Sequence, residues 1–102
     1  MKEYDLFVPL HFPGGARIPE STIAALKKRL VDRFGGLTHF SQTNEGLWKI
    51  GRVTFRDEIT ILRVLADHEA EADGFFRELK QAMERDFQQE EVLMISREVM
   101  LV

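Results

Sequence analysis

Two segments with helical periodicity separate strand-like runs along the chain, and their order limits the fold more than any other feature. The first helical stripe of apolar residues is Ile23, Leu26, Leu30 and Phe34. The second is Ala72, Phe75, Phe76, Leu79, Met83 and Phe87. The order of strand, helix, two strands, helix and strand predicts an α+β domain, in which an antiparallel sheet carries both helices on one face.

Residues that form turns and caps set the expected limits of these elements. Pro13-Gly14-Gly15 ends the first strand, and Gly35-Gly36 closes the first helix. Pro9 lies within the first strand and indicates a sheet edge, a bulge or an earlier end of the strand. In chain order, the expected elements are a strand at Tyr4–Phe12, a helix at Pro19–Phe34, a strand at Leu37–Thr43, a strand at Ile59–Leu65, a helix at Glu69–Gln88, and a last strand that begins at Val92–Ile95 and continues at Val99–Val102 after the polar Ser96-Arg97-Glu98.

The segment between the second and third strands has a less regular pattern. Asn44-Glu45-Gly46 has the composition of a turn, and Arg56-Asp57-Glu58 has that of another. Between them Gly51 interrupts an apolar run, as expected at a turn, a bulge or a close backbone approach. We therefore expect a small additional hairpin around residues 47–56.

The composition restricts the classes of function. The 102 residues fit one domain, 1–102, and 44% hydrophobic with 30% charged residues is typical of a folded chain. A net charge of -3 gives no broad attraction for nucleic acid, so we expect no such partner. The absence of cysteine excludes disulfides, thiolate metal sites and cysteine nucleophiles. Because no apolar run resembles a signal peptide or approaches the roughly 20 residues of a membrane span, we expect a cytoplasmic protein without a membrane partner.

The strand patterns predict a sheet with two apolar faces. Ile59 and Ile61 point to the opposite side from Leu62 and Val64. One layer of helices covers only one face, and a large exposed apolar face favours association. We expect a homodimer through this open sheet face. The alternative is that the additional hairpin or the loop from Pro13 to Ile18 folds over it.

The three histidines are the side chains that normally titrate near neutral pH. His11 lies at the end of the first predicted strand and His39 lies in the second. One interpretation is that the two side chains share a pocket, and in that case both are candidate catalytic residues. His68 follows Asp67 and is expected to be solvated. The histidine spacing forms no metal-binding motif, and an ordinary structural role is the competing interpretation for each.

Trp48, the only tryptophan, has two interpretations. With Tyr4, His39 and Phe40 it can wall an apolar cavity, and Trp48, His39 and Arg52 are the candidate ligand-binding residues. Alternatively, Trp48 is a buried anchor for the additional hairpin. Arg52 and Arg63 can each hold a carboxylate in a bidentate contact, although a salt bridge is the commoner use of an arginine.

Motifs for several common chemistries do not occur in the sequence. The pairs Gly14-Gly15 and Gly35-Gly36 fit neither phosphate-binding loop pattern, and no serine has the context of a nucleophile elbow. We therefore predict no nucleotide, metal or other cofactor.

Phe34-Gly35-Gly36-Leu37-Thr38, followed by Gly46-Leu47-Trp48 and Gly51, forms a short pattern. It resembles a pattern in small uncharacterised bacterial proteins of ferredoxin-like fold. The order of elements is also similar to that of the dimeric α+β barrel proteins, which pair through their sheet faces and include small monooxygenases, heme-degrading enzymes and ligand-binding regulators. These resemblances imply a ferredoxin-like βαββαβ fold and assign no activity.

Three functions remain open at the level of sequence. The first is a small dimeric module that binds a small apolar or aromatic ligand near Trp48 and His39. The second is a small oxygenase or isomerase, cofactor-independent or heme-linked, that uses His39 or His11 as its acid or base. The third is a protein interaction module without a ligand, in which the dimer presents its charged helices to a partner.

Overall fold

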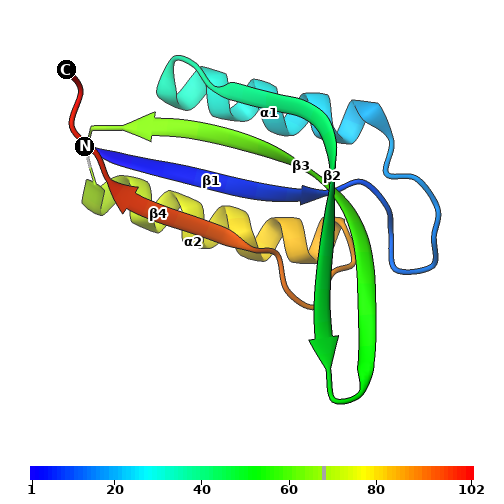
Figure 1. The fold of residues 1–102 in the computed structure, drawn as a ribbon. Helices are drawn as coiled ribbons and strands as arrows, with labels where there is room; N and C mark the ends of the chain where they lie inside the picture. The colour runs from blue at the N-terminus through cyan, green and yellow to red at the C-terminus, as the bar shows by residue number, and fades with distance from the viewer. Residues whose placement is uncertain (68) are drawn as a thin grey trace.

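The computed structural model describes residues 1–67 and 69–102 and has the predicted order of elements (Figure 1). The elements are β1 (Lys2–Pro9), α1 (Glu20–Phe34), β2 (Thr38–Ile50), β3 (Val53–Ala66), α2 (Glu69–Asp86) and β4 (Met94–Glu98). Within the described residues the strands form one antiparallel sheet in the order β2-β3-β1-β4. The predicted fold class, α+β with ferredoxin-like βαββαβ order, is confirmed.

Alternation along the two central strands builds the core on one side of the sheet. Leu6 and Val8 of β1 and Leu62 and Val64 of β3 point to this side and are fully or almost fully buried. The helix residues in the same cluster are Ile23, Leu26, Leu30, Ala72, Phe76, Leu79 and Met83, and Phe87 joins it directly after α2. Both helices therefore cover one face through the stripes that the helical spacing predicts. We call the other side of the sheet the open face.

The helix limits agree closely with the predictions. Pro19 precedes the first turn of α1, and Gly35 ends the helix in a left-handed conformation with φ of 85°. The Gly35 N–H donates to the Val31 carbonyl at 2.8 Å, which satisfies one of the last carbonyls of the helix. Among the described residues, no helix is long and apolar enough to cross a membrane. His68, which we expected to be solvated, lies outside the described residues.

The first and last strands differ from their predicted limits. β1 ends at Pro9, where it pairs with Ile59, and it lies between β3 and β4. Three explanations were open for Pro9. The strand does end earlier than the apolar pattern suggested, whereas an edge position in the sheet is wrong because β1 is a central strand. β4 includes Ser96-Arg97-Glu98, which we expected to interrupt it, because these residues pair with β1. Residues 99–102 lie outside the strand.

The largest difference concerns the hairpin, which is formed by β2 and β3 themselves. Asn44-Glu45-Gly46 and Arg56-Asp57-Glu58 are not turns, because they pair with each other across the two strands. The chain instead reverses after Ile50, where Gly51 takes φ of 62°. A bulge between Phe40 and Asn44 separates the part of β2 in the main sheet from the part that projects past the end of β1 (Figure 1).

Candidate functional site

His39 lies on the helix-covered side of β2, opposite Leu62, and both of its ring nitrogens have partners. The Thr60 hydroxyl donates to the Phe40 carbonyl at 2.9 Å, so it accepts from His39 Nε2, which also lies at 2.9 Å. His39 Nδ1 then accepts from the Lys27 ammonium at 3.4 Å. We assign the neutral Nε2-protonated tautomer from this network. These contacts favour a structural role for His39.

The His39 network predicts a pH dependence of stability. Burial of the ring, and next the charge of Lys27, lower the pKa of His39 below its usual value of 6.5. The unfolded chain therefore binds the proton more readily than the folded chain. The resulting loss of stability begins as the pH falls through about 6.5 and continues down to the folded pKa. We expect the melting temperature of the wild type to fall over this range more steeply than that of His39→Gln.

His11→Gln is the matched control for this measurement. His11 lies beyond the end of β1, with Nδ1 3.9 Å from a Glu58 carboxylate oxygen. Its contacts differ from those of His39, and the described interactions do not bring the two rings into one pocket. If His11→Gln flattens the pH profile as much as His39→Gln does, the assignment of the effect to His39 is wrong.

Trp48 lies on the projecting part of the hairpin, opposite Phe55. It is 45% exposed, so it is not a buried anchor within the single chain. Alternation along β3 places Phe55 on the open face, whereas His39 lies on the helix-covered side. The structure therefore does not bring Trp48 and His39 together. Arg52, the third candidate ligand-binding residue, is exposed in the turn at the hairpin tip.

The projecting hairpin has one apolar and one largely polar side. Cross-strand pairing and alternation place Trp48, Ile50, Val53 and Phe55 on the apolar side, with Asn44 and Asp57 on the same side nearer the main sheet. The polar side contains Glu45, Leu47, Lys49, Thr54, Arg56 and Glu58. Arg56 Nε donates to a Glu45 carboxylate oxygen at 2.8 Å on this polar side. The apolar side continues the open face, because Phe55 and Ile61 have the same orientation along β3.

The open face of the main sheet is also exposed and partly apolar. Leu65 and Ile95 are exposed there, and Phe40 and Ile61 are half-buried. Residues 13–17 of the long loop are exposed, and Ile18 turns into the core on the opposite side. Neither this loop nor the projecting hairpin folds over the open face, so the alternative covering of this face within one chain is wrong.

Charged residues at the centre of the open face form a cluster of two carboxylates and two guanidinium groups. We call Glu3, Asp5, Arg63 and Arg97 the acid–arginine cluster. Arg63 donates through Nε and Nη2 to the two Asp5 oxygens, at 2.8 and 3.1 Å. Arg97 donates to Glu3 at 3.0 Å and to Asp5 at 3.3 Å. Asp5 is only 5% exposed. The formal charges cancel, and each carboxylate is paired with a guanidinium.

This cluster was not predicted from the sequence, although Arg63 was expected to be able to bind a carboxylate. Glu3 and Asp5 are two residues apart on β1, which places both on one face. Their partners depend on strand register: Asp5 lies opposite Arg63, and Glu3 lies opposite Arg97. Arg63 also lies over Phe40, with 5.0 Å between the guanidinium carbon and the ring centroid.

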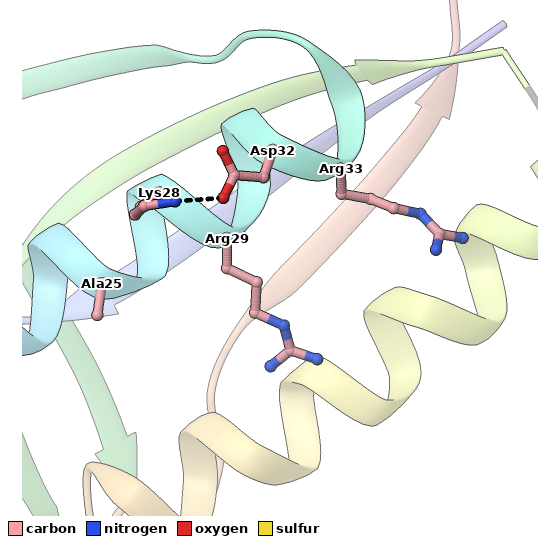
Figure 2. A pocket seen from close by; sticks show the side chains of 5 residues that line it. All are labelled: Ala25, Lys28, Arg29, Asp32 and Arg33. Carbon is pink, nitrogen blue, oxygen red and sulfur yellow. Dashed lines mark hydrogen bonds and ion pairs between the residues drawn. The ribbon is translucent and has the colours of Figure 1, made fainter.

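A shallow depression of about 470 Å³ lies beside α1 (Figure 2). Arg29 and Arg33 extend from α1 toward α2, while Lys28 pairs with Asp32 along the helix at 2.6 Å. Both arginines lie over the ring of Phe75, at 5.1 and 5.2 Å from its centroid. These contacts indicate packing between the helices, and we assign no ligand to this depression.

Comparison with known proteins identifies a shared fold and no sequence family. No family model matches the chain. No curated protein matches it in sequence. A solved structure of a phage SAM lyase in complex with S-methyl-5'-thioadenosine is similar to this chain, with a TM-score of 0.70 and 14% sequence identity. The similarity covers 95% of this chain and 80% of that one. At this identity the likeness concerns the fold alone.

Proposed function

We propose that this protein is a homodimeric module that binds a small molecule, and that its subunits pack through the open faces of their sheets. The observation that carries the dimer is the projecting hairpin. Its apolar side, with Trp48 and Phe55, continues the open face and has no covering within the described chain. In the dimer, this side of each hairpin lies against the partner subunit.

The size of this surface supports a stable association. An isolated two-stranded ribbon is marginally stable in water, so the projecting hairpin gains from a partner. Each strand residue covers the product of the strand spacing, about 4.8 Å, and the rise per residue, about 3.3 Å. Summed over the strands of the open face and the hairpin, the area is on the order of 700 Å². Stable interfaces bury about 800 Å² on each partner. One copy of the chain therefore offers a surface of suitable size for a second.

The charges of the acid–arginine cluster are compatible with burial in this interface. An unpaired charge would lose its hydration when covered, at a cost of several kcal/mol. In the acid–arginine cluster, Arg63 and Arg97 already pair with Asp5 and Glu3 inside one chain. A second copy can therefore cover the cluster without leaving these carboxylates unpaired.

Light scattering after size-exclusion chromatography tests the dimer. We expect a mass twice that of the 11.8 kDa chain at micromolar concentration. A mass of one chain under these conditions would contradict the proposed interface. A mass of three chains would contradict the dimer.

Small-molecule binding is supported by the structural neighbour, which was solved with S-methyl-5'-thioadenosine bound. Of the candidate residues, Arg52 is exposed in the turn at the hairpin tip, and Trp48 lies on the side that we place at the subunit interface, so a ligand at the edge of this interface would contact both. We expect S-methyl-5'-thioadenosine or S-adenosylmethionine to raise the melting temperature saturably. Trp48→Ala should reduce that rise and His39→Ala should retain it. No rise with either compound would contradict this choice of ligand.

A further inference from the structure

A groove of about 320 Å³ lies between α2 and the edge strand β4. This volume is at the lower end of the range for small-molecule sites, about 300 to 1,000 Å³. Apart from Ile95, its lining residues on β1 and β4 lie on the helix-covered side of the sheet. The groove is therefore separate from the open face and independent of the proposed dimer.

Aromatic and aliphatic groups form the apolar part of the groove. Tyr4 and Phe76 stack with ring centroids 4.0 Å apart, and both rings are almost fully buried. Met94 adds a half-buried side chain beside them. Because Tyr4 and Phe76 are each only 3% exposed, the stacked rings form a rigid floor under the groove and present a small apolar surface beside Met94.

Positive charge exceeds negative charge along the groove. Its lining contains Lys2, Arg77 and Lys80 against the carboxylate of Asp73. The Tyr4 hydroxyl and the Lys2 ammonium both donate hydrogen bonds to the Asp73 carboxylate, that of Lys2 at 2.9 Å. The hydrogen bond from Tyr4, and next the one from Lys2, lower the pKa of Asp73. Asp73 is thus ionised and already paired, so it presents little unbalanced negative charge to a ligand.

Arg77 is the cation in the groove that remains available. Lys80 is held by Glu84 at 3.3 Å and by Glu91 at 2.8 Å, and Lys2 is held by Asp73. Arg77 is exposed and its charge helps to lower the pKa of Asp73, but within residues 1–67 and 69–102 it forms no hydrogen bond or ion pair like those that hold Lys2 and Lys80. Its guanidinium can offer two parallel donors to a carboxylate or phosphate.

We propose that the α2–β4 groove binds a compact organic anion, in which a carboxylate or phosphate meets Arg77 and a small attached apolar group lies over the floor formed by Tyr4, Phe76 and Met94. The Ser96 hydroxyl on β4 supplies a further polar contact in the same groove. The ligand class follows from the exposed guanidinium of Arg77 beside a small apolar floor, since Lys2 and Lys80 are paired with carboxylates. This inference gives the proposed small-molecule function a second site, distinct from Trp48.

Titration with benzoate and phenyl phosphate, followed by amide chemical shifts, tests this site. Benzamide serves as the neutral analogue of benzoate. We expect both anions to shift amides of residues 73–80 and 94–96 saturably, and benzamide to bind at least several-fold more weakly. Because a hydrogen bond to a charged group contributes about tenfold or more in affinity, Arg77→Gln should weaken both anions roughly tenfold. Arg77→Lys should retain part of the affinity.

Arg85→Gln is the matched control, because Arg85 is an exposed arginine of α2 outside the groove. It should bind the anions as the wild type does. The proposal is overturned if neither anion shifts these amides, if benzamide binds as tightly as benzoate, or if Arg77→Gln and Arg85→Gln have equal effects. The dimer is tested separately, by measuring the mass of the protein in solution. The groove variants should leave this mass unchanged, so failure of the groove proposal is distinguishable from failure of the dimer proposal.

Discussion

Phe55→Asp is expected to convert the dimer into monomers. Phe55 lies opposite Trp48 on the apolar side of the hairpin and is 44% exposed in the single chain, so an aspartate is accommodated there without disturbing the core. In the dimer the same carboxylate would be buried against apolar groups without a partner, at a cost of several kcal/mol. The dissociation constant should therefore rise roughly a hundredfold or more. Light scattering over a dilution series measures this change.

Leu47→Asp provides the matched control for this experiment. Leu47 is also a large apolar residue of the projecting hairpin, but it lies on the polar side, opposite Arg56. An aspartate there stays in water and can pair with Arg56, so the dimer mass should be unchanged. Dissociation by Leu47→Asp, or persistence of the dimer with Phe55→Asp, would show that the interface is not formed by the side of the hairpin that continues the open face.

The fold was predictable because its core follows local periodicity. The stripes on α1 and α2 are continuous at helical spacing, and both are buried where expected, as Leu30 and Leu79 illustrate. The helix ends were equally well marked, since Gly35 takes the left-handed conformation that its type favours. Both signals need only residues close together in the chain.

The hairpin was predicted at the right place but with the wrong extent, because pairing between strands overrode the local composition. Asn44-Glu45-Gly46 has turn-forming residues, yet it continues a strand whose partner is present across the ribbon. A β-carbon on Gly46 would lie 3.5 Å from the Trp48 ring, so this glycine lies close to the indole. A usable signal was present, because the side chains alternate symmetrically on both sides of Gly51-Arg52.

The acid–arginine cluster was not predictable in the same way. Glu3 and Asp5 have partners about 60 and 90 residues away, and those partners are defined only by the register of β1 with β3 and β4. A shift of one residue would move Arg63 or Arg97 to the helix-covered side. The predicted open face, in contrast, needed only alternation within single strands, and that is why it was found.

Leu62→Ala is expected to lower the stability of the fold by about 3 kcal/mol, because it removes buried methyl groups and leaves a cavity. Leu62 is 0% exposed on β3, with β1 on one side and β2 on the other, and it packs in the cluster shared by both helices. For a domain of this size the melting temperature should fall by roughly 10 to 20 °C. Urea denaturation at one fixed protein concentration measures the change, because dimerisation makes stability depend on concentration.

Leu47→Ala is the matched control for Leu62→Ala, because it removes the same methyl groups from a leucine outside the core. Leu47 is 61% exposed on the polar side of the hairpin, so Leu47→Ala should change stability by no more than about 0.5 kcal/mol. Equal losses for the two variants would contradict the placement of Leu62 in the core. Because Leu62 points away from the open face, its variant should weaken folding without altering the surface that contacts the partner. Refolded Leu62→Ala protein should therefore still dimerise, whereas Phe55→Asp should fold and remain monomeric.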